Sequence, residues 1–175
     1  MNHYFSRLRA AINQPTTRKQ RVWLIGWIVL LSVLAMFFTR FHFAINLSPS
    51  LPGKLYLVER GTLPARGDLA EFRFDGAVYT RGTRMVKRAA GVGGSLVDVA
   101  PLPDGRMELR VDGAMVGVAK RHASSGRPLT ASKPRVLDAD EYYMAATHPD
   151  SFDSRYVEFG AVKREQIIGR AIEVF

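Results

Sequence analysis

An uncharged apolar segment near the N-terminus constrains the fold of this chain more than any other feature. Residues 22–38 are 17 consecutive residues without a charged side chain. As a helix they would extend about 25 Å at 1.5 Å per residue, slightly less than the roughly 30 Å hydrocarbon core of a bilayer. Thr39 and Arg40 can make up the difference, because a long basic side chain reaches the lipid headgroups. Residues 22–40 are therefore predicted to form a transmembrane helix.

Two other interpretations of this segment compete with a membrane span. A cleaved signal peptide would have a shorter apolar region and small residues at its cleavage site, whereas Thr39-Arg40-Phe41-His42-Phe43 follows here. A buried helix of a soluble protein is rarely apolar on every side over this length. Both alternatives fit the sequence less well than a membrane anchor.

The net charge of +9 would by itself suggest a nucleic-acid-binding protein. Residues 1–21 contain five basic residues and no acidic one, which leaves 20 of the 25 basic residues against 16 acidic residues afterwards. Much of the excess therefore lies in a basic leader, 1–21, and we expect no nucleic-acid partner. Because basic flanks stay in the cytoplasm, the leader is predicted to be cytoplasmic. Residues 41–175 would then lie on the outer, periplasmic side of a single-pass protein of the inner membrane.

Beyond the anchor, the sequence has the pattern of a β-rich domain. Short runs of strand-forming residues are separated by turn signals such as Asp75-Gly76 and Asp104-Gly105. The chain has no cysteine, which excludes disulfides and a cysteine nucleophile. We predict a mainly β fold, with a single antiparallel β domain over 41–175 after one N-terminal transmembrane helix. The strand candidates are residues 55–58, 69–74, 85–90, 96–99, 107–111, 142–146 and 167–175, with a polar loop at 122–135.

Lys87 is predicted to point into an apolar environment. In a strand over 85–89, Lys87 shares one face with Met85 and Ala89, while Arg84 and Arg88 lie on the other. Burial disfavours the charged ammonium and lowers the pKa of a lysine. A shift from about 10.4 to 7–8 corresponds to roughly 4 kcal/mol, and the neutral amine could then take a proton from a serine. The alternative is a lysine on an edge strand whose amine reaches solvent.

Ser50 lies in a stiff segment between Pro49 and Pro52. The prolines keep this segment out of a helix, so the loop can hold a hydroxyl in one orientation, as a nucleophile requires. Ser48 could place a second hydroxyl nearby and donate to an oxyanion together with the Ser50 backbone N–H. An ordinary Ser/Pro/Gly turn is the alternative.

Five short motifs, in the same order along the chain, resemble those of type I signal peptidases. Ser50-Leu51-Pro52 resembles their nucleophile box, and Arg66-Gly67-Asp68 begins a segment similar to their Arg-Gly-Asp strand. Residues 85–91 resemble the lysine box, 151–156 the Ser-x-Asp-Ser-Arg box, and 167–171 the closing strand. Each motif alone is weak, but five in order after an N-terminal anchor are specific.

The resemblance implies a serine–lysine endopeptidase that removes the signal peptide of exported precursors, on a β scaffold and without metal or cofactor. By position, Ser50 would be the nucleophile and Lys87 the general base and acid. Ser48 would help to bind the oxyanion, and Ser151 would hydrogen-bond the lysine. The membrane and an exported precursor polypeptide are thus the expected partners.

The resemblance also implies a structural ion pair near the site, between Asp153 and Arg155. The chain departs from the family in two places. Residues Ala145-Ala146-Thr147 stand where members commonly have Gly-Asp-Asn, which could change the packing over Lys87. Gly93-Gly94-Ser95 replaces the Pro-Gly-Asp that follows the lysine box in general signal peptidases.

The short chain and residues 46–56 are most similar to the TraF-type peptidases of conjugative transfer systems. Those enzymes process pilin precursors, and some join the new ends into a ring. This favours a pilin-like substrate over the role of a housekeeping type I signal peptidase. The missing Gly-Asp-Asn leaves a further hypothesis, a catalytically inactive envelope-assembly component.

His148 offers an alternative base for Ser50. It precedes Pro149-Asp150, so a Ser-His-Asp triad can be imagined. Lys87 has the better sequence context, and His148 is therefore predicted to be a loop residue.

Overall fold

The computed structural model describes residues 17–48, 50–76 and 78–175 of the chain. Most of the predicted basic leader, 1–21, lies outside these residues. The chain divides into two compact units, the first ending at Thr39 and the second beginning at Arg40. Each unit is described by itself below.

Helix α2 (Arg18–Arg40) contains the predicted apolar segment. Its first turn is closed by a reciprocal pair of hydrogen bonds, in which the Thr17 amide donates to Gln20 Oε1 (2.8 Å) and the Gln20 amide donates to Thr17 Oγ1 (3.4 Å). Its apolar side chains are exposed on every side, and by length and composition it is apolar enough to cross a membrane. A helix that is hydrophobic all round needs an apolar surrounding, which a bilayer would supply.

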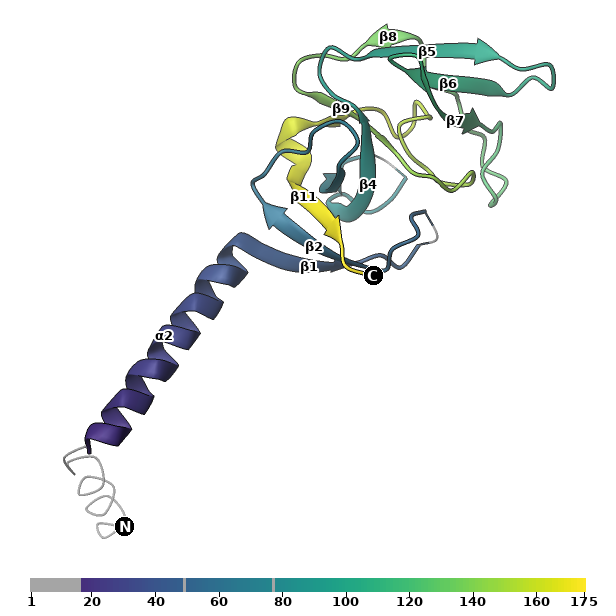
Figure 1. Ribbon diagram of the computed structural model, residues 1–175. Helices are drawn as coiled ribbons and strands as arrows, with labels where there is room; N and C mark the ends of the chain where they lie inside the picture. Colours follow the sequence, from purple (N-terminus) through teal and green to yellow (C-terminus); the bar gives the residue numbers. More distant parts are fainter. Residues whose placement is uncertain (1–16, 49, 77) are drawn as a thin grey trace. The chain divides into compact units, whose positions relative to one another are not determined.

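The second unit consists of two antiparallel sheets (Figure 1). Within the described residues, the larger sheet has seven strands and the smaller has four. The larger has the order β1 (Phe41–Ile45), β2 (Leu55–Arg60), β11 (Ile167–Glu173), β3 (Leu69–Phe74), β4 (Thr83–Gly91), β9 (Glu141–Ala145) and β10 (Val162–Lys163). The smaller has the order β7 (Ala114–Ala119), β6 (Met107–Val111), β5 (Leu96–Pro101) and β8 (Arg135–Val136), and a 3-10 turn, η1 (Arg164–Gln166), precedes β11.

The predicted mainly β fold with one N-terminal apolar helix is confirmed. Strands lie at each predicted position, and the closing strand ends at Glu173. Strands β1 and β7 and the two-residue strands β8 and β10 were not predicted from the sequence, and β8 begins at the last residue of the predicted polar loop, 122–135. Strand β1 directly follows the apolar helix, and its Phe-His-Phe-Ala-Ile sequence lacks a turn signal that would mark a new element.

The core consists of three apolar clusters. One lies on one face of β3, β4 and β9, and another on the opposite face with β1, β2 and β11. The third fills the space against the smaller sheet. In strand β4, Ala89 is fully buried in the first cluster. Lys87 shares this face of β4, because alternate residues of a strand point to the same side.

Candidate active site

The loop after β1 holds Ser50 through the side chain of Asn46. Asn46 Nδ2 donates to the carbonyls of Leu51 (3.3 Å) and Gly53 (3.2 Å). Its Oδ1 accepts from the Ser48 amide (3.1 Å) and from Ser48 Oγ (2.9 Å). Asn46 therefore fixes both ends of the serine-bearing turn, a role that the sequence alone did not indicate.

Two further contacts fix this loop on the sheet. Leu51 is buried in the apolar cluster that also contains Val58 and Ala146. The Tyr56 hydroxyl donates to the Gly53 carbonyl (2.9 Å), and a side chain at Gly53 would collide with Tyr56 and Glu173. The loop is thus rigidly packed, as a nucleophile-bearing segment needs to be. Pro49, which was predicted to stiffen the loop, lies outside the described residues.

The side chains of Ser48 and Ser50 lie together. Their hydroxyl oxygens are 2.8 Å apart and share a hydrogen bond. Ser50 is only 8% exposed, whereas Ser48 is on the surface. The site therefore presents two adjacent hydroxyls, one of them withdrawn from bulk water.

Lys87 lies in β4, opposite Ala70 of β3, and is 5% exposed. Its Nζ donates a hydrogen bond of 2.9 Å to Ser151 Oγ. Burial lowers the pKa of Lys87 to about 8; the Asp153 carboxylate opposes this shift and the Arg155 guanidinium reinforces it. At pH 7 about a tenth of this amine is therefore unprotonated, and this neutral fraction can act as a base.

A buried ion pair supports the loop that carries Ser151. Arg155 binds Asp153 through two hydrogen bonds, Nε to Oδ1 (2.8 Å) and Nη2 to Oδ2 (2.9 Å), and both side chains are almost fully buried. Burial alone would lower the pKa of Arg155, but the Asp153 carboxylate raises it above its usual range. Arg155 Nη2 also donates to the Ser151 carbonyl (3.0 Å), and Asp153 Oδ2 accepts from the Ala146 amide (3.0 Å). The pair thus ties the Ser151 loop to the end of β9.

The backbone of His148 connects the two halves of the site. Its amide donates to the Ser50 carbonyl (3.4 Å), and its carbonyl accepts from the Ser151 amide (3.1 Å). Its ring Nδ1 accepts from the Asp150 amide (3.1 Å), while the Asp150 carboxylate pairs with Lys120. The His148 ring and the Asp150 carboxylate therefore bind partners other than Ser50. Within the described residues, Ser50, His148 and Asp150 do not form a triad.

The structure thus pairs Ser48 with Ser50 and Lys87 with Ser151, and joins the two pairs through His148. In the part of the chain that the structure describes, Ser50 Oγ and Lys87 Nζ are not hydrogen-bonded to each other. Catalytic hydrogen bonds are often loose before substrate binds. The arrangement supplies a sheltered hydroxyl, an amine of low pKa and a second hydroxyl suited to an oxyanion, which together suit acyl transfer.

Comparison with protein families gives one result. A family model described as signal peptidase, peptidase S26, matches residues 18–175. The matched region covers helix α2 and both sheets, including every site residue described above. No curated protein matches the chain.

Proposed function

Because the chain belongs to the signal peptidase family, peptidase S26, we propose that it is a membrane-anchored serine endopeptidase with a Ser50–Lys87 dyad. Its substrate would be a pilin-like precursor of a conjugative transfer system, from which it removes the leader peptide. The observation that carries the dyad is the buried, hydrogen-bonded amine of Lys87, whose pKa is about 8. Helix α2 would anchor the enzyme in the inner membrane with its N-terminus in the cytoplasm and residues 41–175 outside.

The chemistry would begin with the neutral form of Lys87. Ser50 Oγ attacks the scissile carbonyl and passes its proton to Lys87 Nζ, after its hydroxyl turns from Ser48 toward the amine. Ser48 Oγ and the Ser50 backbone N–H would stabilise the oxyanion. Lys87 then gives its proton to the leaving amine, and an acyl-enzyme remains on Ser50. Ser151 would keep the lysine aligned throughout, through the hydrogen bond of 2.9 Å.

The acyl-enzyme could be resolved by water, which yields a linear product, or by an amine of the substrate, which yields a ring. The same chemistry would serve a housekeeping signal peptidase. The replacement of Gly-Asp-Asn by Ala145-Ala146-Thr147 supports the rival role of an inactive envelope-assembly component. These roles differ in the products that they leave.

Co-expression with a pilin-like precursor tests the proposal directly. We expect mass spectrometry to detect a mature product whose new end follows a small residue, and a cyclic product would be one water lighter than the linear one. A housekeeping enzyme would process unrelated exported precursors equally well. An unprocessed precursor, in the presence of a folded and membrane-bound chain, would favour the assembly role.

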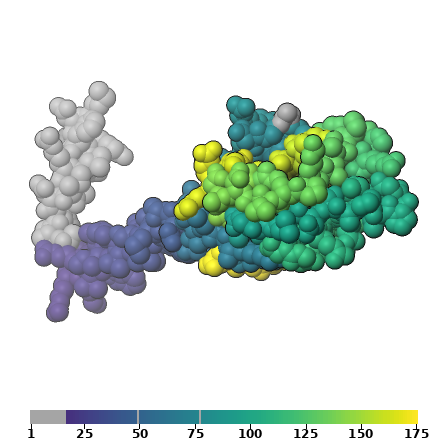
Figure 2. All heavy atoms as spheres, turned by 90° about the horizontal axis from the view of Figure 1, so that it is seen from above, coloured from purple at the N-terminus to yellow at the C-terminus, as the bar shows by residue number. Residues whose placement is uncertain are grey.

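Exposed apolar side chains on the outer face of β1, β2 and β11 support the proposal that this face contacts the bilayer. The register places Phe43, Leu57 and Ile172 in one row across the three strands, and pairs Ile45 with Leu55 in the next. Phe43, Ile45 and Ile172 are exposed, as are Leu47, Val174 and Phe175 beyond the strand ends. Atoms of the C-terminal part of the chain, coloured yellow, are visible on the surface in Figure 2. Because exposed apolar patches mark interaction surfaces and β1 directly follows the anchor, we infer that this face rests in the lipid headgroup region.

A fluorescent probe can test this membrane face, because the chain has no native cysteine. With an environment-sensitive dye on Ile172→Cys in bilayers, we expect emission that is blue-shifted relative to that of the same dye on a solvent-exposed loop. The matched control is Val157→Cys, which is comparably exposed but lies outside the three strands. Equal emission from both sites in bilayers would contradict the proposed contact.

A further inference from the structure

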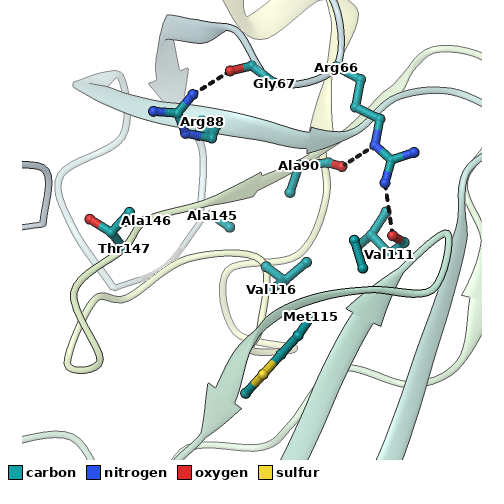
Figure 3. Close-up of a pocket in the computed structure, with 11 residues that line it drawn as sticks. Arg66, Gly67, Arg88, Ala90, Val111, Met115, Val116, Ala145, Ala146 and Thr147 are labelled. Carbon is teal, nitrogen blue, oxygen red and sulfur yellow. Dashed lines mark hydrogen bonds between the residues drawn. The ribbon is translucent and has the colours of Figure 1, made fainter.

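A pocket of about 310 Å³ lies beside the site, on the face of β4 opposite to that of Lys87 (Figure 3). Arg88 and Ala90 of β4 line it, and Ala145, Ala146 and Thr147 at the end of β9 form one wall. Figure 3 shows Met115 and Val116 of β7 across from the two arginines, Arg66 and Arg88. The pocket is large enough for one amino-acid side chain and combines an apolar lining with a few polar groups, as ligand sites commonly do.

The two arginines of the pocket differ in their partners. Arg66 is fully engaged, since it donates to the carbonyls of Ala90 (3.2 Å) and Val111 (3.0 Å) and pairs with Asp112 (2.9 Å). Within the described residues, the guanidinium group of Arg88 donates to the Gly67 carbonyl alone, at 2.5 Å. Among the described residues, no carboxylate lies within ion-pair distance of Arg88. Several of its five N–H donors are therefore available to a ligand.

The wall next to Arg88 also lacks a negative charge. The strand register places Arg88 opposite Ala145, and Ala146 follows it. In the family that the motifs resemble, these positions commonly carry Gly-Asp-Asn, so a methyl group stands here in place of a carboxylate. The residues that line the pocket include two arginines and no carboxylate, so the pocket is positively charged.

We propose that this pocket binds an acidic side chain of the polypeptide substrate, with its carboxylate on Arg88 and its methylene groups against Val116 and Ala145. The pocket adjoins the loop of Ser50, because Ala146 lines it and packs in the same apolar cluster as Leu51, and because Thr147 precedes His148, whose amide contacts the Ser50 carbonyl. This inference rests on the proposed function and narrows the substrate class to precursors with a glutamate or aspartate near the cleavage site. A charge-assisted contact of this kind is about twice as strong as a neutral one.

A pair of peptides tests the pocket without any need for turnover. The full-length chain carries Ser50→Ala in detergent micelles, and fluorescence anisotropy compares peptides that differ only in one Glu or Gln, placed at successive positions. At one position, we expect the Glu peptide to bind about tenfold more tightly than the Gln peptide. Added salt should reduce this ratio.

Variants of the pocket should change the ratio in a defined way. Arg88→Gln is expected to bring it to about one, since the cation is lost. Ala146→Asp, which supplies an internal carboxylate, should do the same while keeping Arg88. Arg106→Gln is the control, because Arg106 is a surface arginine paired with Asp104 outside the pocket, and it should keep the tenfold ratio.

Three results would overturn the proposal. One is equal binding of the two peptides to the unmodified pocket at every position, and another is a ratio that survives in folded Arg88→Gln. The third is a dependence on Arg88 only in binding to vesicles that contain phosphatidylglycerol, which would assign the pocket to a lipid headgroup. The proposed peptidase function is judged separately, by cleavage of a neutral precursor by the chain with Ser50 intact.

Discussion

Replacing Ser50 with alanine is expected to reduce precursor cleavage by about four orders of magnitude or more. In the proposed mechanism the acyl-enzyme forms on this hydroxyl, so its loss removes the covalent step altogether. The methyl group of alanine fits the space, and Ser50 contributes its backbone carbonyl, not its side chain, to the contact with His148. The variant should therefore remain folded, and the rate of mature product formation should be measured by mass spectrometry.

Two serine controls make this result specific. Ser48→Ala should retain the nucleophile and lose an oxyanion donor, which costs about two to three orders of magnitude in rate. Ser125→Ala changes an exposed residue in the loop between β7 and β8 and should leave cleavage unchanged. Full activity of Ser50→Ala in a preparation free of host peptidase would contradict its assignment as the nucleophile.

Lys87→Met should likewise abolish cleavage, because no other base is placed to deprotonate Ser50 in the proposed mechanism. Methionine has a similar length and is apolar, so it suits the face that Lys87 shares with Ala89. The expected loss is comparable to that of Ser50→Ala, because the two residues act as a unit and their effects are not additive. The double variant should thus be no less active than either single variant.

The same substitution should stabilise the fold at neutral pH, which separates a catalytic role from a structural one. The pKa of Lys87 is about 8 in the folded chain against an ordinary value of 10.5, a difference of about 3 kcal/mol at 1.4 kcal/mol per unit. At pH 7 the amine is mostly charged in both states, so folding bears the full cost of burying the ammonium. This cost falls as the pH rises from about 8 to 10.5, where the unfolded chain binds the extra proton.

Denaturant unfolding at pH 7 should therefore show Lys87→Met to be more stable than the unmodified chain, by up to about 3 kcal/mol. The gain should shrink above pH 8. Lys133→Met is the matched control, because Lys133 is exposed and bears no such cost. A Lys87→Met variant that is strongly destabilised at pH 7 would indicate that the amine holds the loop of Ser151 in place instead of serving as a base.

Much of the fold follows from local patterns in the sequence. The apolar helix and most strands are encoded by periodicity and turn signals, which depend on neighbouring residues. Strand β7 is not encoded by such local patterns, because the small residues of its Ala-Met-Val-Gly-Val-Ala sequence are matched to the structure around the strand. A side chain at Gly117 would meet the Arg155 guanidinium, so that glycine is explained only by a partner distant in the sequence.

The site shows the same division. The burial of Lys87 and the closeness of Ser48 to Ser50 follow from strand and loop spacing. The contact of Lys87 with Ser151 joins residues 64 positions apart, and only the resemblance to a family suggested it. The bridging side chain of Asn46 was not predicted at all, since its four hydrogen bonds depend on how the loop folds back. The pocket next to Arg88 also depends on tertiary structure, because four separate segments line it.

The pH dependence of kcat/KM tests most directly whether an uncharged Lys87 activates Ser50. If it does, kcat/KM should rise about tenfold per pH unit below about 8 and level off above that value, because only the neutral amine accepts the proton. His148→Ala should leave this profile unchanged. A profile centred near 6.5, the usual value for histidine, that disappears in His148→Ala would contradict the account and assign the base to the imidazole.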